Sequence, residues 1–127
     1  MLFTDSLRDM VNATEGAIAG LMMDSAGVAL ASYVSSEAVA SPGEPAVDID
    51  AVGVEFGVLL SAIRRAVASL EAGETREVTI GTDKMVTIIR PLGNSYFVAM
   101  SLRPDGNIGK GRFLMRTADP QLRLELQ

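Results

Sequence analysis

The segment DIDAVGVEFGVLLSAIRRAVASLE, residues 48–71, decides the fold of this chain. Apolar side chains recur along it at intervals of three and four residues, which is typical of one long amphipathic helix. Asp48 and Asp50 stand at its start, where the helix dipole favours negative charge. The periodic pattern ends at Ala72-Gly73-Glu74, so we predict a helix over residues 48–71.

This predicted helix is apolar on more than one side. One stripe consists of Ile49, Val52, Phe56, Leu59, Ile63, Val67 and Leu70. Val54 and Val58 lie on other sides of the same helix. A helix of this kind has to be buried on more than one side, and a chain of 127 residues has little material left to cover the second side. We therefore predict a second subunit there; the alternative is a helix with one broad core face and scattered surface valines.

Five apolar segments flank the central helix and predict the strands of one sheet. They cover residues 17–24, 28–34, 76–83, 84–92 and 95–102. The first two surround a glycine-containing turn and predict a β-hairpin, while tight turns join the last three into an antiparallel meander. Val78 and Ile80 alternate with polar residues in the first meander strand, so we expect that strand at an edge of the sheet.

Two shorter helices are predicted near the ends of the chain. Residues 4–13 carry apolar side chains at helical spacing. Asn107 is a suitable cap for a second helix, which we expect to run from Ile108 to Ala118 and to stop ahead of Pro120. Residues 120–127 are then predicted to form a tail.

The chain as a whole, residues 1–127, is predicted to form a single domain. Residues 35–47 are rich in Ser, Pro and Gly, so we expect a surface loop there. The element order αββαβββα implies an α+β fold in three layers. In this arrangement a five-stranded antiparallel sheet carries the long helix on one face and both terminal helices on the other.

The composition excludes several classes of function. The chain has no cysteine and no histidine, which removes thiol and imidazole chemistry, disulfides and the usual zinc sites. A net charge of −5 and the absence of tryptophan disfavour nucleic-acid binding. No apolar run approaches the roughly 20 residues that span a bilayer. We therefore expect a cytoplasmic protein that is not an enzyme, with no cofactor, no metal, no nucleic-acid partner and no membrane insertion.

Three groups of residues are candidates for chemistry. DGNIGKGRF, residues 105–113, is glycine-rich but lacks the Gly-Lys-Ser/Thr ending of a phosphate loop, so we interpret it as a turn before a helix. Lys110, Arg112 and Arg116 form a basic cluster that suits either an acidic partner or a solvated helix face. Arg64 and Arg65 have the chemistry of an arginine supplied in trans to phosphoryl transfer, or they only solvate the helix end.

The element order and three segments resemble the Roadblock family, which is named for a dynein light chain and includes the bacterial mutual gliding-motility protein B. GAIAGLMMDSAGVALAS (residues 16–32) is similar to the opening hairpin of the family. LEAGETREVTIGTDKMVTIIRPL (70–92) is similar to its helix exit and strand pair, and NIGKGRFLM (107–115) to its closing helix. The resemblance implies a longin-like or profilin-like sandwich that forms homodimers and binds Ras-like GTPases.

The resemblance and the apolar central helix together predict how the protein works. We expect a homodimer, alone or within a higher oligomer, that regulates a small Ras-like GTPase by binding its GTP-bound form. The alternative is a scaffold or light chain that leaves GTP hydrolysis unchanged. No catalytic residue is assigned. The dimer and partner interface is predicted to involve Val52, Glu55, Phe56, Leu59, Ile63, Arg64, Arg65, Val78 and Ile80.

Overall fold

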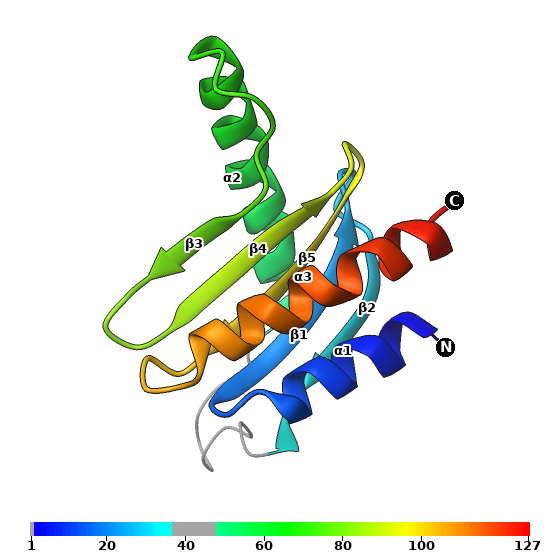
Figure 1. The fold of residues 1–127 in the computed structure, drawn as a ribbon, viewed down its shortest axis with the longest axis vertical. Helices are drawn as coiled ribbons and strands as arrows, with labels where there is room; N and C mark the ends of the chain where they lie inside the picture. The colour runs from blue at the N-terminus through cyan, green and yellow to red at the C-terminus, as the bar shows by residue number, and fades with distance from the viewer. Residues whose placement is uncertain (1, 37–47) are drawn as a thin grey trace.

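The computed structural model describes residues 2–36 and 48–127, and its described elements follow the predicted order αββαβββα (Figure 1). The helices are α1 (Leu2–Ala13), α2 (Ile49–Ser69) and α3 (Ile108–Glu125). The strands are β1 (Ala17–Asp24), β2 (Ala29–Val34), β3 (Val78–Gly81), β4 (Val86–Leu92) and β5 (Tyr96–Leu102). Most of the predicted loop at 35–47 lies outside the described residues.

The five strands form one antiparallel sheet in the order β2-β1-β5-β4-β3. The predicted edge position of β3 is therefore confirmed, with β2 at the opposite edge. Figure 1 shows α1 and α3 crossing the near face of the sheet and α2 behind it. The predicted three-layer α+β sandwich is confirmed.

The larger core lies between the sheet and the two terminal helices. α1 begins at Leu2, two residues before the predicted start, and buries Leu7 and Met10 against the sheet. α3 buries Met115 and Leu122 on the same face. The sheet contributes Met22, Ala31, Ile88, Leu92, Val98, Met100 and Leu102. This face is closed by two helices, and its buried side chains are almost fully inaccessible to solvent.

The smaller core lies between the sheet and α2. Its buried members are Leu21, Met23, Leu60, Ile89, Phe97 and Ala99. Asp48 caps α2 by accepting a hydrogen bond from the backbone N–H of Ala51 at 3.2 Å. Gly53 lets the helix approach β1 closely, because a Cβ at this position would lie 2.3 Å from Cδ2 of Leu21. The first half of α2 is thus seated on the sheet through a glycine.

The C-terminal end of α3 differs from the prediction. The helix does not stop ahead of Pro120 but continues to Glu125, so residues 120–125 are helical and do not form a tail. A proline inside a helix costs about 3 kcal/mol, because it removes one backbone donor and clashes with the preceding turn. Tertiary contacts offset this loss: Leu122 is buried, and Arg123 binds both Asp119 and the carbonyl of Pro91. The predicted cap is confirmed, since Asn107 accepts from the N–H of Lys110 at 3.0 Å.

Candidate protein-interaction surface

The outward side of α2 is the most apolar exposed surface of any helix. Only Gly53 and Leu60 of its 21 residues are buried. Val54 is 42% exposed, Val58 64% and Leu59 40%. Isolated exposed aliphatic residues are common, but here Val54 and Val58 lie one turn apart on one side of the helix, and Leu59 is exposed next to Val58, about 100° further round the helix axis. We call Val54, Val58 and Leu59 the α2 strip.

The residues predicted at the interface fall into two groups. Glu55, Leu59 and Arg65 are exposed on α2. Val52, Phe56, Ile63, Arg64, Val78 and Ile80 are only partly exposed. Within this second group Phe56, Val78 and Ile80 pack against the smaller core, so part of their surface already serves the fold of their own protomer.

Val54 and Val58 were missing from the predicted interface. The sequence showed that they lie on a different side of the helix from the main stripe. It did not show which side faces the sheet, because Gly53, a residue with no side chain, makes the closest approach. A small residue flanked by valines is the signal that could have indicated this orientation.

A groove runs beside the α2 strip. It has a volume of about 200 Å³ and lies between α2 and the turn that joins β1 to β2. Its lining residues are Met23, Asp24, Ser25, Ala26, Gly27, Val54, Gly57, Val58 and Ser61. Asp24 fixes the turn, because its Oδ1 accepts from the N–H groups of Ala26 and Val28, each at 2.9 Å. The apolar strip therefore borders a recess with a rigid wall.

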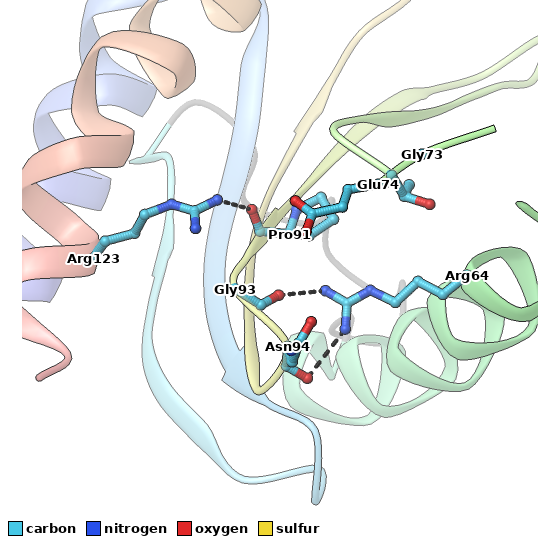
Figure 2. Close-up of a pocket in the computed structure, with 8 residues that line it drawn as sticks. Arg64, Gly73, Glu74, Pro91, Gly93, Asn94 and Arg123 are labelled. Atoms are coloured by element: carbon cyan, nitrogen blue, oxygen red, sulfur yellow. Dashed lines mark hydrogen bonds between the residues drawn. The ribbon is translucent and has the colours of Figure 1, made fainter. Parts of the chain in front are cut away.

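Arg64 ties α2 to the turn between β4 and β5, at the same end of the sheet as the turn between β1 and β2. Its Nη2 donates to the carbonyl of Gly93 at 2.7 Å and its Nη1 to the carbonyl of Asn94 at 3.1 Å (Figure 2). Both acceptors belong to the turn between β4 and β5. Arg65 is exposed, and its guanidinium makes no hydrogen bond or ion pair with the described part of the chain. The two neighbouring arginines thus have different roles: the first is structural and the second is solvated.

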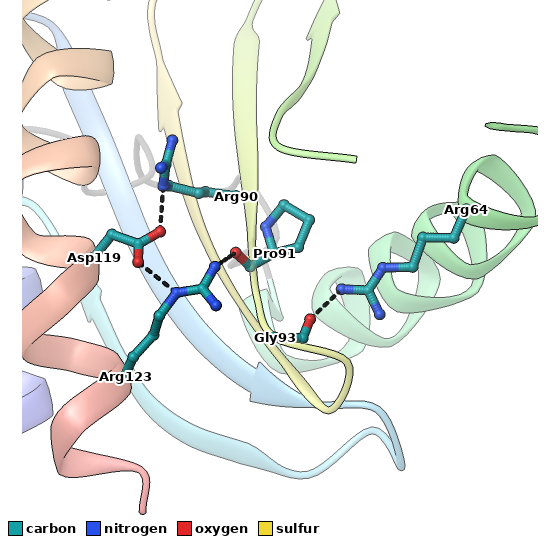
Figure 3. Close-up of polar contacts among 6 residues, drawn as sticks. All are labelled: Arg64, Arg90, Pro91, Gly93, Asp119 and Arg123. Carbon is teal, nitrogen blue, oxygen red and sulfur yellow. Dashed lines mark hydrogen bonds and ion pairs between the residues drawn. The ribbon is translucent and has the colours of Figure 1, made fainter. Parts of the chain in front are cut away.

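A second polar cluster joins α3 to the sheet. Nε of Arg90 donates to Oδ2 of Asp119 at 2.6 Å, and Nε of Arg123 donates to the other carboxylate oxygen (Figure 3). Arg123 also donates to the carbonyl of Pro91 at 3.2 Å. Burial alone would raise the pKa of Asp119, but the hydrogen bonds and positive charges of Arg123 and Arg90 hold it below its ordinary value. Asp119 is therefore a buried anion with two cationic partners.

The edge strand β3 is attached to α3 by a third polar cluster. Nε of Arg112 donates to both carboxylate oxygens of Glu77, at 2.8 and 2.9 Å. Its Nη2 donates to the hydroxyl of Thr79 at 3.1 Å. Within the predicted basic cluster, Arg112 therefore serves the fold, while Lys110 and Arg116 are exposed.

The described residues offer neither a metal site nor a membrane-spanning helix. Across residues 2–36 and 48–127, no group of three or more Asp, Glu, His or Cys side chains is placed to hold a metal ion. No helix in this part of the chain is long and apolar enough to cross a bilayer. The features that remain are the α2 strip, its groove and the polar cleft next to Arg64.

An antiparallel sheet of five strands between one long helix and two terminal helices is the architecture of Roadblock-type domains, and solved structures agree. No protein-family model matches the sequence, and neither does any curated protein. The crystal structure of MglC from Myxococcus xanthus is 31% identical, covers 98% of this chain and 99% of that one, and has a TM-score of 0.66. A structure described as MglB with tetrameric arrangement is 18% identical and covers 94% and 83%, with a TM-score of 0.80.

A third structure supplies the family name. The Roadblock/LC7 domain from Streptomyces avermitilis is 14% identical, covers 94% of this chain and 96% of that one, and has a TM-score of 0.73. At this low identity, the Streptomyces and MglB structures support the fold alone. The identity of 31% over nearly the full length of both chains shows more than the fold. This chain belongs to the Roadblock/LC7 family.

Proposed function

We propose that this chain is a non-enzymatic, cytoplasmic homodimer that binds the GTP-bound form of a small Ras-like GTPase and tunes its hydrolysis of GTP. The observation that carries this proposal is the exposed α2 strip of Val54, Val58 and Leu59. A helix of 21 residues with two buried positions gains little from packing on its own sheet. A second copy that covers the strip would supply the missing burial.

The shape of α2 supports the same arrangement. Figure 1 shows its C-terminal half reaching past the end of the sheet. Leu70, just beyond the helix, is 76% exposed. β3 lies at the edge of the sheet, held in place by Arg112 on one face and by Val78 and Ile80 on the other. A second protomer could cover the projecting helix and extend the sheet at β3 together.

The class of partner follows from family membership and not from the geometry. The resemblance to Roadblock proteins implies a Ras-like GTPase. If the protein accelerates hydrolysis, we expect it to act by holding the switch segments of the GTPase in an ordered state. Arg64 is disfavoured as an arginine inserted into the active site of the GTPase, because two of its donors already bind carbonyls of its own chain and hold it at the β4–β5 turn. Arg65 is the arginine on α2 that is free to reach a partner.

The occupied guanidinium of Arg64 also favours the second candidate function, a scaffold. A homodimer that supplies no arginine to the reaction can hold two partners together without changing a reaction rate. The two functions differ in one measurable quantity, the turnover of bound GTP.

The test is single-turnover GTP hydrolysis by the small GTPase of the same organism, with and without an excess of this protein. Accelerated hydrolysis supports the regulator. Complex formation with no change in hydrolysis or nucleotide exchange supports the scaffold. If hydrolysis is accelerated, Arg65→Ala and Arg64→Ala separate the two arginines, and we expect only the first to reduce the acceleration without loosening α2. Absence of any complex at micromolar concentrations contradicts both.

A further inference from the structure

A cleft in the described structure lies where α2 leaves the sheet, and none of the residues of the α2 strip lines it. Its volume is about 320 Å³. The residues lining it are Arg64, Gly73, Glu74, Thr75, Pro91, Gly93, Asn94 and Arg123. Figure 2 shows Arg64 approaching the β4–β5 turn from α2 and Arg123 approaching Pro91 from α3. Side chains from two helices therefore meet at one end of the sheet.

Both arginines in this cleft are fixed in position by the backbone. Arg64 is bound to the carbonyls of Gly93 and Asn94, and Arg123 to the carbonyl of Pro91 and to Asp119. A guanidinium carries five N–H donors, and each of these two uses two of them in the contacts above. Each keeps spare donors while its position is set in advance. This is the condition under which an arginine binds an oxyanion with little further loss of side-chain freedom.

The charges around the cleft do not balance. Asp119 is shared by Arg90 and Arg123, which leaves the charge of one arginine uncompensated there. Among the described residues, Arg64 has no carboxylate partner at all. Glu74 is the one further carboxylate in the lining, and it is exposed and makes no ion pair within the described ranges. The lining itself thus carries two guanidiniums, Arg64 and Arg123, against one carboxylate, Glu74, although the chain as a whole carries a charge of −5.

An unpaired hydroxyl lies in the same lining. Oγ1 of Thr75 is buried and has no hydrogen-bond partner in the described structure. A buried hydroxyl without a partner loses free energy relative to one in water, so a ligand that supplies an acceptor is favoured at this position. The cleft therefore offers fixed guanidinium donors, one hydroxyl and a single excess positive charge.

The geometry points to a site for one carboxylate, the side chain of an aspartate or glutamate presented by a protein partner. A single carboxylate matches the one excess charge, whereas a phosphate dianion would exceed it. The volume suits a side chain better than a nucleotide, since pockets for larger ligands extend to about 1,000 Å³. This site does not depend on the proposed GTPase partner, and it is separate from the α2 strip.

The test is a titration of the isotope-labelled full chain, followed by NMR at the amides of Gly73, Thr75 and Asn94. The probe is a blocked tripeptide with glutamate between two glycines. The control probes are the same peptide with glutamine, and acetate. We expect saturable shifts with the glutamate peptide, none with the glutamine peptide, and weaker binding of acetate. Equal shifts with glutamate and glutamine overturn the site, and acetate binding as tightly as the glutamate peptide overturns a side chain as its ligand.

Three variants locate the binding. Arg64→Gln should weaken binding of the glutamate peptide about tenfold, the effect of losing one charge-assisted contact. Arg65→Gln removes the same charge one residue away, outside the cleft, and should leave binding within about twofold. Glu74→Gln removes a competing carboxylate from an exposed position and should tighten binding about threefold. If Arg64→Gln does not fold, Glu74→Gln tests the carboxylate site by itself. A Glu74→Gln variant that binds the glutamate peptide no more tightly than the wild type contradicts the site.

Discussion

The two faces of the sheet are built differently. On one face, α1 and α3 lie together over a large core, and both helices bury several side chains. On the other face, α2 is the longest helix and yet buries only Gly53 and Leu60. The first face is complete within one protomer. The second has an apolar strip facing outward, and we propose that another chain covers it.

The largest expected effect lies on the complete face. Leu122→Ala should lower the free energy of unfolding by about 2–5 kcal/mol, because Leu122 is 1% exposed and the truncation leaves a cavity. Leu124→Ala is the matched control two residues along the same helix, where the side chain is 61% exposed, and should change stability by less than about 0.5 kcal/mol. Urea denaturation at one fixed protein concentration measures both. Equal effects would contradict the continuation of α3 past Pro120.

The second largest effect on stability is expected at Asp119, the buried carboxylate of α3. Asp119→Asn should lower the unfolding free energy by about 3 kcal/mol, because it leaves Arg90 and Arg123 without their anion. Asp105→Asn removes a largely exposed partner of Arg103 and is the control, with an expected effect below about 0.5 kcal/mol.

The loss at Asp119 should depend on pH. Its pKa is lowered in the folded state, so its ion pairs stabilise the protein above the ordinary aspartate pKa of about 4. This contribution disappears as the pH falls through the lowered value. The stability difference between wild type and Asp119→Asn should therefore be full at pH 7 and shrink below about pH 4. A difference that persists unchanged in acid would show that the carboxylate charge is not responsible.

A smaller effect of either sign tests how α2 is seated. Gly53→Ala places a methyl group 2.3 Å from Leu21 and 2.7 Å from Met23, so both side chains must shift, and we expect a loss of about 1–2 kcal/mol. Gly57→Ala meets Phe97 at an ordinary 3.6 Å and should gain up to about 1 kcal/mol from helix propensity. Thermal denaturation of both variants compares them. Stabilisation by Gly53→Ala would mean that α2 does not approach β1 at this residue.

The sequence predicted the complete face better than the open one. Strand alternation, turn residues and the cap at Asn107 are local signals, and each of these elements was placed within a few residues. The predicted end of α3 is wrong. Pro120 is a local stop signal, but the burial of Leu122 in the core and the hydrogen bond from Arg123 to the carbonyl of Pro91 stabilise the helix beyond it. No spacing rule brings Arg90 to Asp119 or Arg112 to Glu77, since these pairs are 29 and 35 residues apart.

The orientation of α2 shows a different limit. The sequence shows the amphipathic period of α2. Which apolar side packs on the sheet depends on Gly53, and a glycine does not show up in a pattern of hydrophobic side chains. Phe56 and Ile63, predicted at the interface, are partly covered by their own protomer, whereas Val54 and Val58 are exposed. Which apolar side faces a partner is fixed only when the sheet is in place.

The most direct test of the central claim is the mass of the protein in solution. Sedimentation equilibrium should give a dimer or a multiple of it for the wild type, and a folded monomer for Val58→Arg, with the circular dichroism of the wild type. The charge lies on a residue that is 64% exposed, so it should leave the protomer intact while preventing burial of the strip. Thr117→Arg, which introduces the same charge at an exposed position of α3 on the other face of the sheet, is the control and should weaken association far less. A wild-type monomer at all concentrations, or a Val58→Arg variant that still dimerises with unchanged affinity, would contradict the account.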